Sequence, residues 1–262
     1  MAAPEDNPPG ESIVSPTLIA HILELRRRLL HSVATLLIIF FCMFPFQNRV
    51  FEWVARPMLE RLPEGSSMIA TGVASPFMTP MKLTLVVALF LAVPVFLYHL
   101  WRFISPALYK SERRMFLPLL VSSVLFFYAG VAFAYFVLFP VAFAFLTTAA
   151  PAGVKVMTDI NAYLDFVLTI FFAFGLAFEV PVAIVLMVWA GFVSPRRLKK
   201  VRPYALVGAF FVGMLLAPPD VVSMTLLAVP IYLLYEIGMI MARLMVPGSR
   251  EVDAQQEEEK QA

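Results

Sequence analysis

Six runs of apolar residues, separated by short polar stretches, constrain this chain more than any other feature. Helix is the structure expected there, because backbone in lipid must satisfy its own hydrogen bonds over a core of about 30 Å. Of the 262 residues, 61% are hydrophobic and 15% charged, and the short alternating segments of a β-barrel do not occur. We predict an all-α polytopic membrane protein with six transmembrane helices, at about residues 29–46, 81–104, 116–139, 163–190, 204–217 and 221–241.

The basic residues around these runs predict the orientation. Fifteen of the 20 lysines and arginines flank the start of the first run, the loops after the second and fourth runs, and the end of the sixth. Basic residues are enriched on the cytoplasmic side, so both termini are predicted to be cytoplasmic. The membrane domain is expected over residues 18–244, between a disordered tail at residues 1–17 and a cytoplasmic tail at residues 245–262.

Prolines predict irregular helices. The fifth run lies between Pro203 and Pro218, which leaves 14 residues, or about 21 Å of helix. Such a short helix would thin the bilayer locally. The alternative is that Val201 and Pro203 extend the helix outward, because the fixed φ of proline suits a first turn. Prolines in or beside the other runs should bend helices into a concave wall: Pro94, Pro118, Pro140, Pro181 and Pro230.

Two carboxylates among basic residues are candidate binding groups. Residues 18–30 show an apolar stripe typical of an amphipathic helix, which we expect to lie along the cytoplasmic membrane face. Within it Glu24 either forms a local ion pair with Arg28, four residues on, or accepts an arginine from a ligand. Glu112 belongs either to a solvated charge run or to the same function. Together the two acids could select a ligand with two adjacent arginines.

Two further acids have both a functional and a local interpretation. Glu179 lies within the fourth run, where an acid is costly and is a functional candidate. Its alternative is a protonated side chain bonded to a carbonyl freed by a bent helix. Asp220 could be only the N-cap of the last helix. Motifs for ATP hydrolysis, zinc binding or a serine nucleophile do not occur, so no catalytic residue, metal or cofactor is predicted and the chain is not expected to be an enzyme.

Five segments together carry a family resemblance. They are HILELRRRLL at 21–30, TGVASPFMTPMKL at 71–83, SPALYKSERR at 105–114, FEVPVAIVL at 178–186 and RPYALVGAFFVGMLLAPPD at 202–220. From about residue 18 to 241 the chain resembles the TatC family of the twin-arginine protein translocase. The resemblance implies a receptor for paired-arginine signal peptides in the bacterial cytoplasmic (inner) membrane. It also implies assembly with the single-span TatA and TatB, self-association in a multimeric complex, and movement of folded proteins driven by the proton-motive force, with no nucleic acid involved.

The resemblance also assigns roles by position. It implies a signal-peptide site at Glu24, Arg26, Arg28, Leu29, Phe103 and Glu112. Pro57 and Phe77 would serve in the first periplasmic loop, Glu179 as the buried acid and Asp220 in the last periplasmic turn. Partner docking would involve Met214, Ala217 and Met224, although relatives are expected to have Thr and Gln at the last two positions. The alternatives from other classes are a secondary transporter of a small solute and an intramembrane protease, and the latter lacks a Ser-His or paired-Asp arrangement.

Overall fold

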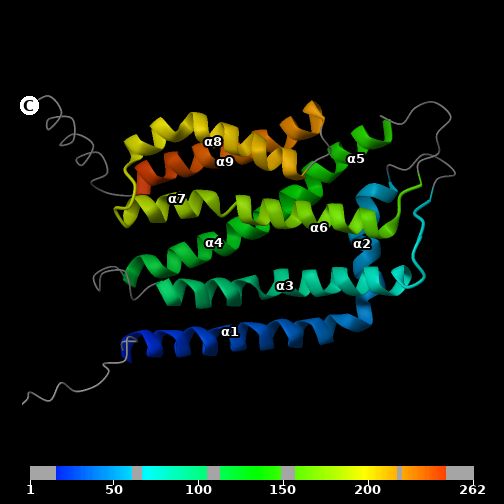
Figure 1. The fold of residues 1–262 in the computed structure, drawn as a ribbon, viewed down its shortest axis with the longest axis horizontal. Coiled ribbons are helices and arrows are strands. Elements are labelled where there is room, and N and C mark those ends of the chain that lie inside the picture. The colour runs from blue at the N-terminus through cyan, green and yellow to red at the C-terminus, as the bar shows by residue number, and fades with distance from the viewer. Residues whose placement is uncertain (1–15, 61–66, 105–112, 149–156, 217–219, 246–262) are drawn as a thin grey trace, which may run out of the picture.

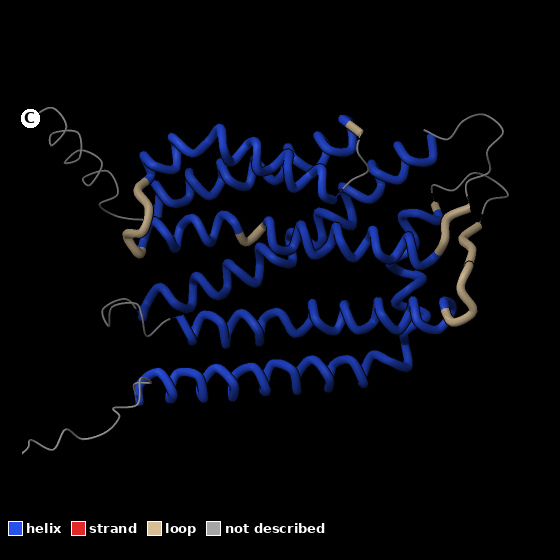
Figure 2. Tube along the Cα trace, viewed as in Figure 1, coloured by secondary structure: helices blue, strands red, loops and turns tan. Residues whose placement is uncertain are grey.

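The computed structural model describes residues 16–60, 67–104, 113–148, 157–216 and 220–245, and the described chain is almost entirely helical (Figure 2). The all-α prediction is confirmed. The elements in order are α1 (Pro16–Met43), the 3-10 turn η1 (Phe44–Phe46), α2 (Gln47–Leu59), α3 (Ser75–Ile104), α4 (Arg113–Phe133), the π-helix η4 (Ala134–Leu138), α5 (Phe139–Thr148), α6 (Ile160–Ala177), α7 (Val180–Trp189), α8 (Pro195–Leu216) and α9 (Val221–Met245).

The long helices lie side by side (Figure 1). Helix α1 packs on α3, α4 on α6, and both α7 and α8 on α9. The start of α1, the end of α3, the α7–α8 junction and the end of α9 lie at the same end of the molecule, on the left in Figure 1. We call this the basic end, because it carries Arg26, Arg27, Arg28, Arg102, Arg196, Arg197, Lys199, Lys200, Arg202 and Arg243.

Composition and length mark five membrane spans among the described residues. They are Leu23–Leu59, Ser75–Arg102, Leu117–Phe145, Ile160–Trp189 and Val221–Met245. Helix α8 is the predicted sixth span, but its first half is basic and only residues 204–216 are apolar. It runs beside α9 for most of its length (Figure 1). The six-span count therefore rests on α8, whose apolar part is shorter than the other spans.

Helix α8 also corrects the expectation of a short fifth helix. It has 22 residues, or about 33 Å, and contains Pro203. The alternative, an outward extension past Val201 and Pro203, is right. Pro203 has no backbone N–H, so one hydrogen bond of the helix is lost. The lost bond lies near Lys199 and Lys200, which are exposed at the basic end. The helix is therefore longer than expected, whereas its apolar part, residues 204–216, stays short, so local thinning of the bilayer stays a prediction.

The first helix differs from its prediction in a similar way. Residues 18–30 were expected to lie along the membrane face, but α1 is one continuous helix of 28 residues. Residues 17–43 contain neither proline nor glycine, so nothing in the backbone breaks the helix between the amphipathic stripe and the span. The stripe thus extends the first span, with Leu25 and Leu29 exposed on its surface.

Two prolines coincide with breaks in the helical rods. Helix α4 passes into a π-helix just before Pro140, and α6 ends at Ala177 before α7 begins with Pro181 in its first turn. Neither a π-bulge nor the first turn of a helix requires the backbone N–H that proline lacks. The remaining prolines predicted to bend helices lie within continuous ones: Pro94 in α3, Pro118 in α4 and Pro230 in α9. The concave wall stays a prediction.

The described residues form two apolar clusters in the interior. The larger joins α2, α3, α4, α5 and α6 around edge-to-face aromatic contacts, in which the Phe90 ring centroid lies 5.5 Å from Phe127 and 5.9 Å from Phe171. The smaller lies nearer the basic end and includes Trp101, Val185, Leu198 and Met239. Gly130 lets α4 approach α6, because a Cβ there would clash with the carbonyl oxygen of Phe174. Helix α3 contributes Phe90 to the larger cluster and Trp101 to the smaller one, so it packs against its neighbours along its length.

Candidate functional site

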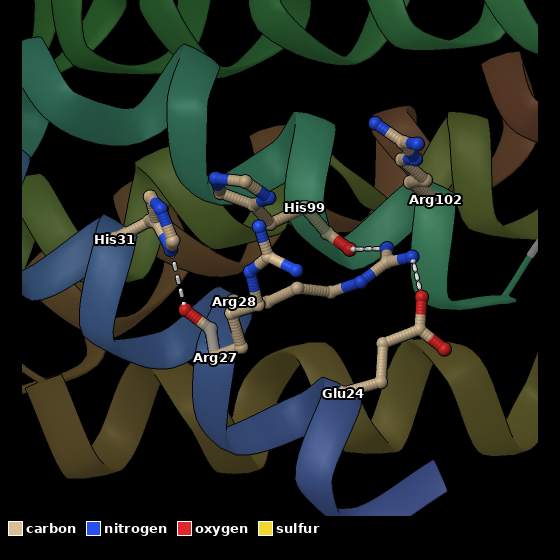
Figure 3. Close-up of a pocket in the computed structure, with 6 residues that line it drawn as sticks. All are labelled: Glu24, Arg27, Arg28, His31, His99 and Arg102. Atoms are coloured by element: carbon tan, nitrogen blue, oxygen red, sulfur yellow. Dashed lines mark hydrogen bonds and ion pairs between the residues drawn. The ribbon is translucent and has the colours of Figure 1, made fainter. Parts of the chain in front are cut away.

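A pocket of about 270 Å³ opens between α1 and α3 at the basic end (Figure 3). In the part of the chain that the structure describes, the lining contains three arginines, two histidines and a single carboxylate: Glu24, Arg27, Arg28, His31, His99 and Arg102. Each side chain comes from one of two helices held in contact, so their relative positions are fixed by that packing. The pocket combines a high density of positive charge with one strong anionic acceptor.

Arg28 occupies that acceptor and fastens the two helices together. Its Nη2 donates to Glu24 Oε1, four residues earlier on α1, and its Nη1 donates to the carbonyl oxygen of His99 on α3 at 3.1 Å (Figure 3). The Arg28 side chain is 13% exposed, whereas that of Glu24 is 47% exposed. The local Glu24–Arg28 pair expected as one alternative is therefore formed. Its second bond joins residues 71 positions apart and was not expected from the sequence.

Two histidines and Arg102 complete the wall of the pocket. His31 Nδ1 lies 2.7 Å from the carbonyl oxygen of Arg27, and the rings of His31 and His99 lie 6.2 Å apart. Arg102 donates to the Tyr98 hydroxyl at 2.9 Å. The two histidines belong to different helices, and the α1–α3 contact brings them together.

The other residues predicted for signal-peptide binding are placed only in part. Arg26 and Leu29 lie on α1 and are exposed, but they do not line the pocket. Phe103 belongs to the last turn of α3, beside the pocket residue Arg102, and its side chain is outside the described residues. Glu112 is also outside them. The structure thus brings Glu24 and Arg28 together, and a joint site with Glu112 stays a prediction.

Glu179 lies at the junction between α6 and α7, where it is the N-cap residue of α7. Its Oε2 accepts a hydrogen bond from Ser123 Oγ on α4, and Ser123 is buried. Its Oε1 is buried and has no hydrogen-bond partner among the described residues. The alternative of a bond from Glu179 to a freed carbonyl is therefore not seen among the described residues, where Ser123 donates to the carboxylate instead.

Asp220 precedes α9 and caps it. Its Oδ1 accepts from the backbone N–H of Ser223 at 2.7 Å, a bond that lowers the pKa of this carboxyl. Asp220 therefore forms the N-cap of its local interpretation, and its role in the last periplasmic turn stays a prediction. Of the docking candidates, Met214 is exposed on α8, Met224 is half-buried on α9, and Ala217 lies outside the described residues.

Pro57 and Phe77 do not share a pocket. Pro57 is buried in α2 and lines a second pocket of about 270 Å³ at the end opposite the basic end. The other lining residues are Trp53, Arg56, Glu60, Tyr135, Phe136 and Pro140. Phe77 is 49% exposed in the first turn of α3. Their predicted roles stay predictions.

The sequence reasoning missed a polar network at that opposite end. Asp159 caps α6 by accepting from the backbone of Asn161 at 2.8 Å and also accepts two bonds from Thr71. Asn161 in turn bonds the side chains of Thr79 and Ser75. An Asp directly before an apolar run is a helix-start signal that could have been noticed. Thr71, its partner in the segment before α3, has no corresponding signal in the sequence.

A half-buried ion pair between α8 and α9 was also missed. Arg202 Nη2 lies 2.6 Å from Glu236 Oε2, and Tyr232 donates to Glu236 Oε1 at 2.9 Å. Tyr235 donates to the carbonyl oxygen of Leu198 at 2.6 Å. Glu236 stands in the last apolar run, where an acid is a signal that deserved the same weight as Glu179.

Comparison with known proteins gives one consistent family. A family model described as Sec-independent protein translocase protein (TatC) matches residues 20–230. TatC of Escherichia coli (strain K12) is 58% identical over 233 residues, 89% of this chain and 90% of the relative. TatC of Haemophilus influenzae is 51% identical over 237 residues, 90% and 93%. A crystal structure of the twin-arginine translocase receptor TatC superposes with a TM-score of 0.75 at 39% identity, covering 86% of this chain and 98% of that one.

Proposed function

This chain belongs to the TatC family of Sec-independent protein translocase proteins, and we propose that it binds paired-arginine signal peptides in the pocket between α1 and α3. Membership makes the chain a core subunit of the twin-arginine translocase. The alternative of a small-solute transporter is not favoured, because the relatives and the solved structures are translocase proteins. The proposal concerns which residues recognise the peptide, and how.

One observation carries the proposal: the pocket already holds a guanidinium group against a carboxylate. Glu24 accepts from Arg28 within a cleft whose other described lining residues carry basic or imidazole side chains. A carboxylate in such surroundings favours a ligand with a planar group that donates several hydrogen bonds, as a guanidinium does. The same surroundings repel cations that cannot reach the carboxylate, which favours selectivity over non-specific attraction.

A second acceptor is proposed at Glu112. Arg102 lines the pocket near the end of α3, and Glu112 follows ten residues later, which an extended chain could span over about 33 Å. Two carboxylates in reach of one pocket would match two adjacent arginines. The exposed Leu29 and Arg26, with Phe103, would flank the peptide beside its arginines.

The surrounding assembly is proposed from the family and the charge distribution. Basic residues gather at one end of the molecule, which supports placing that end in the cytoplasm of a bacterium, where signal peptides arrive. The subunit would assemble with TatA and TatB and with further copies of itself, at the inner membrane. Transport would draw on the proton-motive force, and the chain itself would bind its cargo without catalysing a reaction.

A binding cycle tests the peptide site. A fluorescent synthetic signal peptide is titrated against the full chain in detergent at fixed salt, with Glu24→Gln, Glu112→Gln and the double variant. Each single change should weaken binding by roughly 1–3 kcal/mol, and the double change by less than the sum if both grip one ligand. Replacing both peptide arginines by lysine should weaken binding to the unaltered chain by a similar amount.

Glu60→Gln is the matched control. Glu60 also pairs with an arginine four residues away, at 3.9 Å from Arg56, but it lies at the end opposite the pocket. Its loss should leave peptide affinity unchanged. If Glu24→Gln leaves affinity unchanged as well, the pocket is not the signal-peptide site.

A further inference from the structure

Arg28 differs from an ordinary surface arginine in an i, i+4 pair. Such pairs are usually solvated on both sides, as are Arg56 and Glu60, each 68% exposed. The Arg28 side chain is only 13% exposed, and its two terminal nitrogens contact acceptors on two different helices. Its guanidinium is therefore enclosed in the pocket, while the carboxylate that it contacts stays accessible from outside.

The two acceptors around Arg28 match the shape of a guanidinium group. Glu24 Oε1 supplies a charged oxygen from α1, and the His99 carbonyl supplies a neutral oxygen from α3. The planar fork of a guanidinium directs separate N–H groups at two oxygens at once, whereas an ammonium group is a point charge with no fixed fork. The pair of oxygens is thus specific for the arginine head group, independent of which arginine brings it.

The charge of the pocket restricts how a second arginine can enter. Arg27, Arg28 and Arg102 already line it, with Glu24 as the one carboxylate among the lining residues that the structure describes. Adding another guanidinium would place four such cations against Glu24 and, at most, the proposed second acceptor Glu112, and like charges in a shared cleft repel. Exchanging one guanidinium for another leaves the charge at the acceptors unchanged. Exchange is therefore the favourable route.

We propose that Glu24 and the His99 carbonyl form a receptor for one guanidinium group, and that Arg28 occupies it until an arginine of the signal peptide displaces it. The inference rests on the proposed function, since it assumes that the peptide binds at Glu24. Arg28 is then an internal competitor that lowers the apparent affinity for every peptide by the fraction of time the receptor is occupied. A side chain of the signal peptide that bonds only one of the two oxygens gains too little binding free energy to displace Arg28.

Two variants separate competition from simple charge. Arg28→Gln removes the competitor, and Arg27→Gln removes the same charge from the same pocket without touching Glu24. The paired-arginine peptide should bind Arg28→Gln about two- to fivefold more tightly than Arg27→Gln, because Glu24 is half-exposed and solvent weakens its pair with Arg28. Arg28→Lys, which keeps the charge but loses the fork, should show a smaller gain. Melting temperatures of all variants in detergent report whether the α1–α3 contact survives.

The Glu24→Gln background separates this inference from the proposed function. In that background the peptide should bind Arg28→Gln no more tightly than Arg27→Gln, because the carboxylate for which Arg28 and the peptide compete is gone. If Glu24→Gln by itself does not weaken binding, the proposed function fails. If Glu24→Gln weakens binding but Arg28→Gln and Arg28→Lys bind the peptide no more tightly than Arg27→Gln, the receptor is not occupied by a competitor and the further inference fails alone.

Discussion

Asp159 accepts two hydrogen bonds from Thr71, one from its backbone N–H at 3.0 Å and one from its hydroxyl at 2.7 Å, although 88 residues separate them. Backbone bonds join the same two segments, because Ile69 donates to the Thr158 carbonyl at 3.0 Å and Ile160 donates to that of Ile69 at 2.9 Å. The start of α3 is thereby tied to the start of α6, while Arg28 ties the other end of α3 to α1. The α3 wall of the pocket is held at both ends.

The first prediction concerns Asp159 as a link between segments. Asp159→Ala removes the α6 cap and both bonds to Thr71, and should lower the melting temperature in detergent by about 2–6 °C. Asp165→Ala is the control, because Asp165 forms only an exposed ion pair with Lys82 and a surface pair contributes little. Equal melting temperatures for the two variants would contradict the assigned role.

The second prediction is a pH dependence. Hydrogen bonds from the Thr71 side chain and backbone, then from the backbone of Ala162, lower the pKa of Asp159 from 3.8 to about 2. Because the pKa of Asp159 is lowered in the folded state, its carboxylate contributes its full stabilisation above about pH 3.8, and this contribution is lost as the pH falls through about 2. The melting-temperature gap between the unaltered chain and Asp159→Asn should be constant above pH 4 and narrow toward pH 2. A gap that widens on acidification contradicts this.

The third prediction concerns the α8–α9 pair. Glu236→Gln leaves Arg202 half-buried without its carboxylate and should lower the free energy of unfolding by roughly 1–3 kcal/mol, between exposed and buried pairs. Tyr232→Phe removes only the neutral donor to Glu236 and should cost about 1 kcal/mol. Reversing the pair, with Arg202→Glu and Glu236→Arg together, should recover part of the loss. No recovery would mean that the pair acts through packing instead of charge.

The fourth prediction is the topology. In a Cys42→Ser background, a cysteine at Lys200 on the basic end should react with an impermeant maleimide only from the cytoplasm. One at Ser67, exposed at the opposite end, should react only from the periplasm. Both positions are outside the helix contacts of the pocket, so neither change should disturb peptide binding. Labelling of Ser67→Cys from the cytoplasm would reverse the proposed orientation.

Local features of the sequence predicted the fold class and much of the helix placement. The i, i+4 spacing of Glu24 and Arg28 indicated their ion pair, and Asp220 before an apolar run indicated a cap. The errors at α1 and α8 came from reading a change of composition as a helix end. Polar residues extend a helix into water as readily as apolar ones extend it into lipid, so only a backbone feature could have set the boundary.

Contacts across helices could not be predicted from one sequence. The bond from Arg28 to the His99 carbonyl depends on the rotation and depth at which α1 packs on α3, and neither has a local signal. The acceptor is a backbone oxygen, so residue 99 carries no side-chain mark of its role. The contact of Thr71 with Asp159 shows the same limit, because the helix-start signal at Asp159 is local and nothing in the sequence links it to Thr71.

The last prediction separates transport from recognition at Glu179. This residue lies at the α6–α7 junction and does not line the pocket, so Glu179→Gln should leave peptide affinity within about twofold. Its buried Oε1 has no hydrogen-bond partner among the described residues, which leaves the carboxyl available to a proton or a partner helix. Transport of folded cargo into inverted membrane vesicles should slow about fivefold or more, the equivalent of roughly 1 kcal/mol or more in the barrier.

Ser123→Ala is the matched variant for this prediction, because it removes the hydrogen bond to Glu179 Oε2 and keeps the acid. If the acid itself is needed, Ser123→Ala should slow transport less than Glu179→Gln, since the carboxyl can still exchange a proton or bind a partner. If the role of Glu179 is only to bond Ser123 and hold α4 against the junction, the two variants should slow transport equally. Loss of peptide binding in step with transport in Glu179→Gln would instead place Glu179 within recognition, against the division between the pocket and the junction.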